Sequence, residues 1–200
     1  MNSAFAIYFA HLAYWASLGV AIYVFRSGDN SQSPMASGEP ATNQEKTAPY
    51  SRALVWFHAI AFGIMYWGIG QDVFGHEIPV WFVGQSVVGC AVIALGAALA
   101  VWALAFFHSW RFRAKLDEGH RLATGGPFRL FRHPIYMALN MLALGSAIWI
   151  PSPIVWIGFV LMVIGSDLRG RAEEKLLGEA FGSEYRDYCA RTSRFVPGVY

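Results

Sequence analysis

No charged side chain occurs in the thirty residues from 78 to 107, and this block alone excludes an ordinary soluble fold. As a helix it would be longer than the hydrocarbon core of a bilayer, which about 20 residues can cross. Soluble domains carry about 25% charged residues. Only 14% of this chain's 200 residues are charged, and 56% are hydrophobic. The sequence therefore predicts an integral membrane protein.

Four further segments have the apolar composition of membrane spans. We predict an all-α fold of five transmembrane helices, at about residues 4–25, 53–69, 78–107, 135–150 and 153–166. The last two are short and are separated by a Pro-containing turn, so they are expected to form a helical hairpin. A cytoplasmic helix is expected after the fifth span. The 200 residues are expected to form one membrane domain, with a cofactor-binding part made of residues 108–134 and 167–200.

The basic residues indicate how the chain is oriented. If the N-terminus lies outside and the chain crosses five times, all fifteen Lys and Arg residues fall in the connections 26–52 and 108–134 and in the tail 167–200. The positive-inside rule makes that side the cytoplasm. The net charge of +2 is then a sign of topology and not of nucleic-acid binding. A cleaved signal peptide in place of the first span is disfavoured, because residues 1–3 provide no basic start.

Two histidines lie within predicted spans, His11 in the first and His58 in the second. An ionisable residue inside a membrane is a functional candidate. Near a helix end, however, a histidine can equally lie at the interface or bond a neighbouring backbone group, and both interpretations stay open. The connection 26–52 is rich in Ser, Gly, Pro, Asn, Gln and Glu and is predicted to be a flexible cytoplasmic loop.

Residues 119–136, between the third and fourth spans, are basic and rich in glycine. Pro134 suits the first turn of a helix, which places His133 at the helix start. Unpaired backbone N–H groups and the helix dipole favour an anion there. Arg132 and His133 can add to such a site, and Gly126 lets a ligand approach the backbone closely. We therefore predict a binding site for an anionic ligand group.

An acidic pair, Glu173 and Glu174, follows the fifth span. These carboxylates can hold an ammonium group or accept hydrogen bonds from ribose hydroxyls. A salt-bridged cytoplasmic helix, with Arg169 paired to Glu173, is the plainer explanation of the segment. Both polar segments flank the predicted hairpin on the same membrane face, so we expect them to meet. S-adenosylmethionine has the anionic, cationic and ribose groups that would satisfy both, and the sequence shows no Cys/His spacing typical of a metal site.

The combined motifs resemble those of the isoprenylcysteine carboxyl methyltransferase family and of the wider phospholipid methyltransferases, with the five-span layout of short prokaryotic members. The matching segments are 119–128 (GHRLATGGPF), 132–136 (RHPIY), 173–174 (EE), 181–188 (FGSEYRDY) and 194–197 (RFVP). The resemblance covers roughly residues 119–200. It implies a membrane methyltransferase that uses S-adenosyl-L-methionine and no metal.

The resemblance also implies residue roles. The positions that match cofactor-binding segments are His120, Arg121, Leu122, Ala123, Phe128, His133, Pro134, Tyr136 and Glu173. Arg169 matches an arginine that orients the carboxylate of the substrate. Tyr136 is the second catalytic candidate, although a helix-packing role explains it equally well. Phe128 stands where the family usually has a tyrosine, Ala138 where it frequently has a glycine, and Arg113 where some relatives have a polar amide.

The expected reaction is methyl transfer to a lipophilic carboxylate, which is ionised near pH 7 and needs no general base. Catalysis would then consist of alignment and exclusion of water. A phospholipid amine or a small thiol is the alternative acceptor, and either would need a base such as His133, Glu174 or Tyr136. Two further hypotheses are an NADPH-dependent membrane reductase, because some reductases share the Arg-His-Pro segment, and a scaffold whose basic loops recruit anionic lipid.

Overall fold

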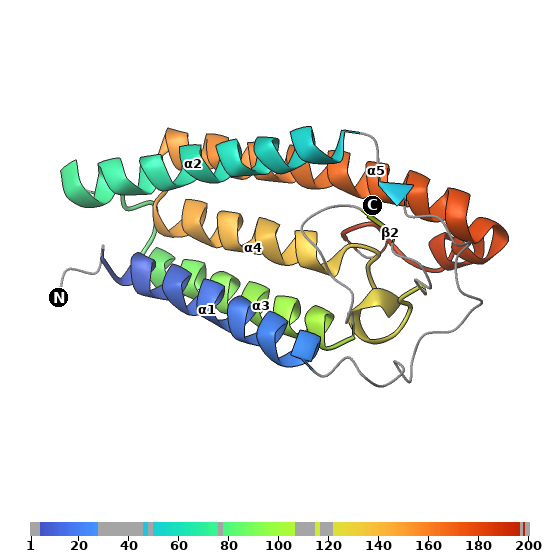
Figure 1. Cartoon of the computed structure of the whole chain (residues 1–200). Helices are drawn as coiled ribbons and strands as arrows, with labels where there is room; N and C mark the ends of the chain where they lie inside the picture. The colour runs from blue at the N-terminus through green and yellow to red at the C-terminus, as the bar shows by residue number, and fades with distance from the viewer. Residues whose placement is uncertain are drawn as a thin grey trace.

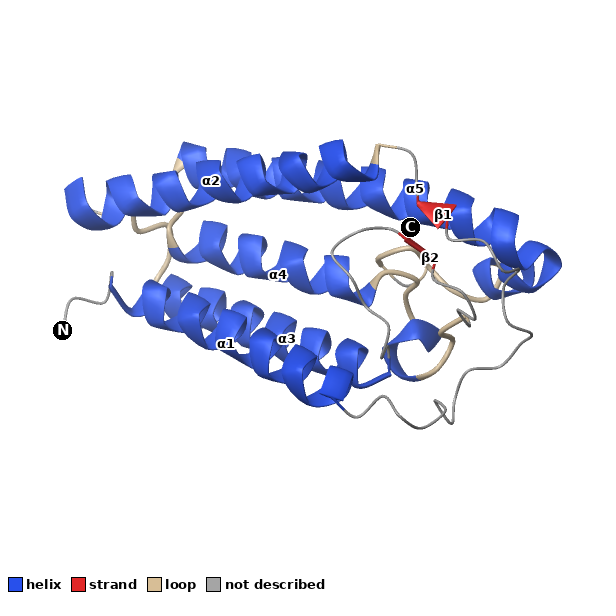
Figure 2. Cartoon of the chain, in the orientation of Figure 1, coloured by secondary structure: helices blue, strands red, loops and turns tan. Residues whose placement is uncertain are grey.

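The computed structural model describes residues 5–27, 46–47, 50–75, 78–106, 115–116, 122–196 and 198. These residues form five α-helices, α1 (Ala6–Ser27), α2 (Ser51–Gly75), α3 (Gln85–Phe106), α4 (Pro134–Trp149) and α5 (Pro153–Cys189) (Figure 1). Three short elements lie in the connections: β1 (Lys46–Thr47), β2 (Lys115–Leu116) and the 3₁₀ helix η2 (Gly126–Arg129) (Figure 2). The predicted all-helical fold is confirmed.

Four of the helices, α1, α2, α3 and α5, are long and apolar enough to cross a membrane, and α4 is a shorter apolar helix. Large apolar side chains point outward from them, as lipid-facing side chains do in a membrane. Examples are Val20, Trp56, Ile60, Leu95 and Ile157, each more than half exposed. The chain is a multi-pass integral membrane protein.

The fifth span differs from its prediction, because α5 does not stop near residue 166. It continues to Cys189, a helix of 37 residues. At about 1.5 Å per residue, its first twenty residues already cross a hydrocarbon core of roughly 30 Å. Residues 167–189 are rich in Glu, Leu and Arg, which favour helix, so nothing ends the helix where the chain leaves the membrane. A separate cytoplasmic helix was therefore a wrong prediction; that segment is the far part of α5, bent at Gly182, where φ is 54°.

The third span also begins later than predicted, at Gln85 instead of residue 78. Residues 78–84 form a turn that ends at Gly84, which has a positive φ of 86°. The Gln85 side chain closes this turn, because its Oε1 accepts a hydrogen bond of 2.8 Å from the backbone N–H of Trp81.

The central helix is α4. It lies between the pair α2 and α5 on one side and the pair α1 and α3 on the other (Figure 1). Twelve of its sixteen residues are buried, polar ones among them. Because no water is available inside a bilayer, the polar groups on α4 have to find partners within the protein. Ser146 of α4, for example, faces His11 of α1.

Glycines let the helices approach closely. A Cβ atom on Gly89 of α3 would lie 2.6 Å from the carbonyl oxygen of Gly145 of α4, and a Cβ on Gly145 would lie 2.6 Å from that of Gly89. On the other side, a Cβ on Gly158 of α5 would lie 2.9 Å from the Cα of Met65 of α2. Close backbone approach of this kind stabilises helix pairs in lipid, where the hydrophobic effect between helices is absent.

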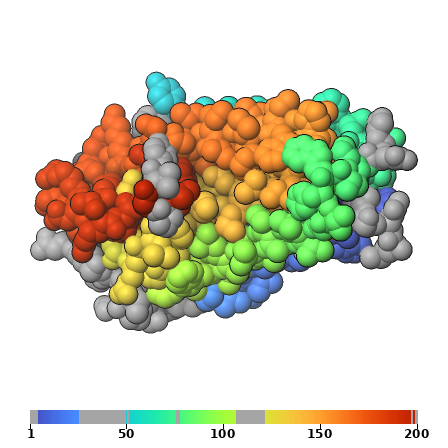
Figure 3. All heavy atoms as spheres, turned by 180° about the vertical axis from the view of Figure 1, so that it is seen from behind, coloured from blue at the N-terminus to red at the C-terminus, as the bar shows by residue number. Residues whose placement is uncertain are grey.

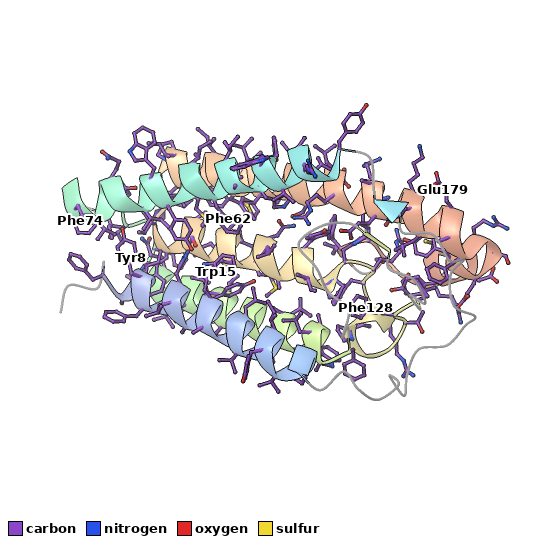
Figure 4. The ribbon with its side chains drawn as sticks, in the orientation of Figure 1. Tyr8, Trp15, Phe62, Phe74, Phe128 and Glu179 are labelled. Carbon is purple, nitrogen blue, oxygen red and sulfur yellow. The ribbon has the colours of Figure 1, made fainter. Side chains whose placement is uncertain are left out.

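Side chains bridge α1 and α2 in front of α4. Figure 4 shows aromatic residues of α1 (Tyr8, Trp15) and of α2 (Phe62, Phe74) between the two helices. A chain of hydrogen bonds lies among them. Trp15 Nε1–H donates to the Tyr66 hydroxyl (2.8 Å), which faces His11 Nδ1 (2.8 Å). His11 Nε2 faces the Ser146 hydroxyl (2.8 Å), which donates to the Leu142 carbonyl (2.7 Å). His11 is therefore buried and ties three helices together.

The two connections at the α4 start also pair with each other. In β1 and β2, Lys46 lies opposite Leu116 and Thr47 opposite Lys115, in antiparallel register. The flexibility predicted for residues 26–52 stays a prediction, since residues 28–45 and 48–49 lie outside the described part of the chain.

Candidate active site

The segment before α4 is shaped by one glycine and covered by the end of α5. Gly126 has a positive φ of 56°, and a Cβ there would lie 2.6 Å from the Phe106 ring, so only glycine fits. Phe128 is buried in the following turn, and its carbonyl accepts a hydrogen bond of 2.8 Å from the Tyr188 hydroxyl. Leu122 packs against Tyr185 and Tyr188. Figure 3 shows the red end of the chain lying against this yellow segment.

The chain after α5 runs beside the start of α4. The N–H of Arg132 donates to the Ser193 carbonyl (2.8 Å), and the N–H of His133 donates to the Arg194 carbonyl (3.3 Å). Pro134 is the first residue of α4, as predicted. The next two backbone N–H groups, those of Ile135 and Tyr136, have no hydrogen-bond acceptor within the described part of the chain. These two N–H groups are the donors that remain for a ligand at this helix start.

Glu174 binds three cationic side chains. Its Oε1 accepts from Arg132 Nε (2.8 Å) and Arg194 Nε (2.9 Å), and its Oε2 accepts from Arg194 Nη2 (2.6 Å). His133 Nε2 lies 3.3 Å from Oε1. Burial alone would raise the pKa of Glu174, but the hydrogen bonds from His133, Arg194 and Arg132 hold this pKa well below its ordinary range. Glu174 therefore joins α5 to the start of α4 and to the segment after α5.

The neighbouring Glu173 meets the other side of the same imidazole. Its Oε2 lies 3.4 Å from His133 Nδ1, and its Oε1 accepts a hydrogen bond from the Tyr136 hydroxyl. Burial lowers the pKa of His133, but hydrogen bonds to Glu173 and Glu174 and the charges of both carboxylates outweigh burial, so this pKa is raised. The carboxylate at each nitrogen favours the protonated form of His133, which can donate on both sides. Gly170 makes room for it, since a Cβ there would lie 3.3 Å from the ring.

Tyr136 connects this cluster to Arg169. The Arg169 guanidinium carbon lies 4.8 Å from the centre of the Tyr136 ring, a cation–π contact, and both residues are buried. The Tyr136 ring is stacked on His133, with ring centres 5.7 Å apart, and the His58 ring lies 6.2 Å away on α2. Tyr136 thus packs among neighbours and also carries a hydroxyl bound to Glu173, so both interpretations of this residue keep support.

The predicted site residues fall into three groups. One cluster lies where the start of α4 meets the far part of α5. It holds Arg132, His133, Pro134, Tyr136, Arg169, Glu173 and Glu174. A wall beside it, made by η2 and the preceding residues, holds Leu122, Ala123, Gly126 and Phe128. His120 and Arg121 lie outside the described residues.

Arg194 and Asp167 belong to the cluster but were not predicted as site residues. Arg194 Nη1 lies 3.1 Å from Asp167 Oδ1, in addition to the bonds with Glu174. The sequence offered one signal for Arg194, its position at the head of the RFVP motif. Nothing in the sequence ranked Asp167 above other acidic residues.

The cluster offers complementary charges at short range. The His133 imidazolium and the two backbone N–H groups of α4 suit an anionic group, and Glu173 suits a cation or hydroxyls. Within the described residues, no three His, Cys, Asp or Glu side chains are grouped as metal ligands would be. The geometry fits a zwitterionic ligand that carries a sugar.

A sequence model of the phospholipid methyltransferase family matches residues 85–184, which include α3, α4 and most of α5. Among similar proteins, the probable protein-S-isoprenylcysteine O-methyltransferase of Oryza sativa subsp. indica is 29% identical over 125 residues, 60% of this chain and 63% of that protein. The protein-S-isoprenylcysteine O-methyltransferase B of Arabidopsis thaliana is 30% identical over 125 residues, 60% of this chain and 61% of that protein. The protein-S-isoprenylcysteine O-methyltransferase of Saccharomyces cerevisiae is 31% identical over 119 residues, 57% of this chain and 49% of that protein.

The matched region spans less than two thirds of each of these relatives. The family match, by contrast, covers half of this chain and contains His133, Tyr136, Arg169 and both glutamates of the cluster. The chain belongs to the phospholipid methyltransferase family, whose methyl donor is S-adenosyl-L-methionine.

Proposed function

We propose that this protein is a membrane-embedded methyltransferase that transfers a methyl group from S-adenosyl-L-methionine to a lipophilic carboxylate, as in isoprenylcysteine carboxyl O-methylation. The observation that carries the proposal is the position of His133, which has a glutamate at each ring nitrogen and is joined through Tyr136 to the buried Arg169. Family membership supports the methyl donor, and the names of the similar proteins support a carboxyl acceptor.

The residues of the cluster suit the cofactor. The N–H groups of Ile135 and Tyr136, with His133 behind them, would hold its carboxylate. Glu173 would accept from its ammonium group or its ribose hydroxyls, and Glu174 would fix His133 and Arg132 in place. The wall made by Leu122, Ala123, Gly126 and Phe128, together with His120 and Arg121, would enclose the remainder. When bound, the cofactor supplies an electrophilic methyl group.

Three residues that could serve as a general base are already engaged. His133 lies between two carboxylates that favour its protonated form, Glu174 accepts from three cationic side chains, and the Tyr136 hydroxyl donates to Glu173. A thiol or a protonated amine would have to lose a proton, whereas a carboxylate would not. This state of the cluster favours the carboxylate over the amine or thiol acceptor.

Arg169 is the residue suited to receive the acceptor. It is buried on α5, one helical turn before Glu173, and the Tyr136 ring fixes its guanidinium. A carboxylate beside it would be aligned with the methyl group while water is excluded, and alignment of this kind lowers barriers by several kcal/mol. We propose that the lipophilic tail of the acceptor enters sideways from the bilayer between the helices.

The orientation of the protein is also part of the proposal. The cluster lies at the end of the helix bundle where α4 begins, together with Arg129, Arg132 and Arg194. The connections at the opposite end carry no Lys or Arg. By the positive-inside rule the active site would face the cytoplasm and the N-terminus the outside.

Calorimetry with S-adenosylhomocysteine on the detergent-purified protein tests the cofactor site. We expect binding that NADPH does not displace and that Glu173→Ala weakens by about tenfold to 100-fold, the range for hydrogen bonds to a charged group. Glu179→Ala is the matched control, because Glu179 projects from the exposed side of the same helix (Figure 4). Displacement by NADPH would favour a reductase, and absence of binding would favour a scaffold.

Radiolabelled methyl transfer then identifies the acceptor class. The protein would be assayed with prenylcysteine analogues, phosphatidylethanolamine and alkyl thiols in the same detergent. Base-labile label on the prenylcysteine carboxylate is the expected result. Label only on the phospholipid amine or the thiol would replace the carboxylate as acceptor.

A further inference from the structure

Two buried histidine–serine pairs lie inside the helix bundle, and they differ in how completely they are paired. In the pair His11 and Ser146, Ser146 donates to the Leu142 carbonyl and so accepts from His11 Nε2–H, while His11 Nδ1 accepts from the Tyr66 hydroxyl. Trp15 donates to Tyr66 in turn. Every side-chain polar group in this hydrogen-bond network has a partner, as a purely structural network in lipid requires.

The second pair, His58 of α2 and Ser166 of α5, has Asn140 of α4 as its third member. His58 Nδ1 lies 3.2 Å from the Leu54 carbonyl oxygen, which can only accept, so the imidazole proton lies on Nδ1. The lone pair on Nε2 faces the Ser166 hydroxyl at 3.4 Å, and Ser166 Oγ lies 2.9 Å from the Asn140 side-chain oxygen.

This trio cannot satisfy all its members, because Ser166 has one hydroxyl proton for two neighbours. If Ser166 donates to Asn140, then His58 Nε2 receives no donor within the described residues and the Asn140 NH₂ group has no acceptor there. If the Asn140 amide is turned over, Ser166 can donate to His58, but the Asn140 oxygen is then left over. Each arrangement leaves hydrogen-bonding capacity unused among these three buried side chains.

The trio adjoins the active-site cluster. Ser166 precedes Arg169 by three residues on α5, and Asn140 follows Tyr136 by four on α4, so each lies on the same helix face one turn deeper in the bilayer. The His58 ring is 6.2 Å from the Tyr136 ring. Gly165 gives His58 its place, since a Cβ there would lie 2.9 Å from the imidazole. His58 lies outside the family-matched segment 85–184.

We propose that His58, Ser166 and Asn140 form an acceptor subsite that binds a neutral hydrogen-bonding group, such as an amide or a hydroxyl, about one helical turn deeper than the methyl-accepting group. This inference rests on the proposed function and narrows its substrate class. The acceptor carries a neutral polar group between its carboxylate and its hydrocarbon tail, so a simple fatty acid is a poor substrate. No member of the trio is charged, which is why the bound group is neutral while the carboxylate lies at Arg169.

Two probes of equal chain length test the subsite. N-dodecanoylglycine has an amide next to its carboxylate, and pentadecanoic acid has methylenes in its place. With radiolabelled cofactor, we expect kcat/KM to be about tenfold higher or more for N-dodecanoylglycine, the selectivity that one or two hydrogen bonds in lipid provide. Equal kcat/KM for the two probes in the wild-type protein would overturn the proposal.

Single substitutions test whether the trio causes the preference for N-dodecanoylglycine. Ser166→Ala and Asn140→Leu are expected to bring the ratio of kcat/KM to about one, mainly through KM for N-dodecanoylglycine, while the affinity for S-adenosylhomocysteine stays unchanged. Ser146→Ala in the saturated pair is the matched control and should leave the ratio as it is. A high ratio that neither Ser166→Ala nor Asn140→Leu alters would overturn the subsite, because selection would then occur elsewhere.

A readout without turnover separates this proposal from the proposed function. An N-acylglycine with a diazirine near its amide is photolabelled onto the protein in the presence of S-adenosylhomocysteine. N-dodecanoylglycine should compete better than pentadecanoic acid, and Ser166→Ala should remove that preference. Labelling with this pattern but no methyl transfer would contradict the proposed carboxylate methylation and still support the subsite. Labelling without any preference would contradict the subsite.

Discussion

Arg194 holds Glu174 side-on, with its Nε 2.9 Å from Oε1 and its Nη2 2.6 Å from Oε2. Two parallel hydrogen bonds between planar groups make this the most specific type of ion pair. Both side chains are largely buried, at 14% and 15% exposure. The pair joins the segment after α5 to α5 itself, next to Glu173, the carboxylate proposed to bind the cofactor. The segment after α5 is therefore part of the site.

Arg194→Ala should therefore destabilise the protein clearly. Removing one partner leaves a poorly solvated carboxylate, a change that costs about 3 kcal/mol in buried pairs. The free energy of unfolding in detergent measures it. Arg191→Ala, on the exposed side of the same segment, should change this free energy by less than about 0.5 kcal/mol. Equal effects of the two substitutions would show that the Arg194–Glu174 pair contributes little.

The stability of the site should depend on pH in two directions. The raised pKa of His133 means that its ion pairs stabilise fully below its ordinary value of 6.5 and are lost as pH rises through the raised value. The lowered pKa of Glu174 means that its contribution is fully present above its ordinary value of 4.5 and is lost as pH falls. Thermal unfolding should show the highest stability between these values. His133→Gln should remove the decline on the alkaline side, and an unchanged decline would assign it to another group.

Arg169→Ala should separate cofactor binding from turnover. The affinity for S-adenosylhomocysteine should be nearly unchanged, whereas turnover on a carboxylate acceptor should fall by about tenfold to 100-fold, as expected for losing a charge-assisted contact. Arg171→Ala, two residues on and 58% exposed, is the control. Full turnover in Arg169→Ala would remove this residue from the acceptor site.

Gly89→Ala should loosen the contact between α3 and α4. The added Cβ would meet the Gly145 carbonyl at 2.6 Å, and a backbone atom cannot move aside cheaply, so the cost should be about 1–3 kcal/mol. Gly63→Ala in α2, where nothing lies within 4 Å of the added atom, should instead stabilise by up to about 1 kcal/mol. Unfolding in detergent compares the two. Similar changes would mean that helix propensity and not the close contact decides the effect.

The meeting of His133 with Glu173 could be predicted because it follows from topology. Both residues flank one helical hairpin on one membrane face, and a hairpin brings its two outer ends together. The motif spacing also indicated that Pro134 begins a helix. These inferences need only chain connectivity and local backbone preferences.

The pairings that depend on side-chain reach could not be predicted. Fifteen Lys and Arg residues were candidates for Glu174, and nothing local selects Arg194, which is twenty residues away. The continuation of α5 past residue 166 was not predicted from the sequence. Hydropathy falls there because the chain leaves the lipid, and a change of surroundings does not by itself end a helix. The His58 trio comes from three helices, so it became visible only with the packing.

The uninterrupted first part of α5 has a consequence for where two reactants of opposite solubility can meet. Glu173 lies twenty residues after Pro153, which at 1.5 Å per residue places it about 30 Å along the helix, one hydrocarbon thickness from the far surface. A water-soluble donor and the proposed lipophilic acceptor would then react at the boundary between their two phases. Neither has to be extracted from the medium in which it dissolves.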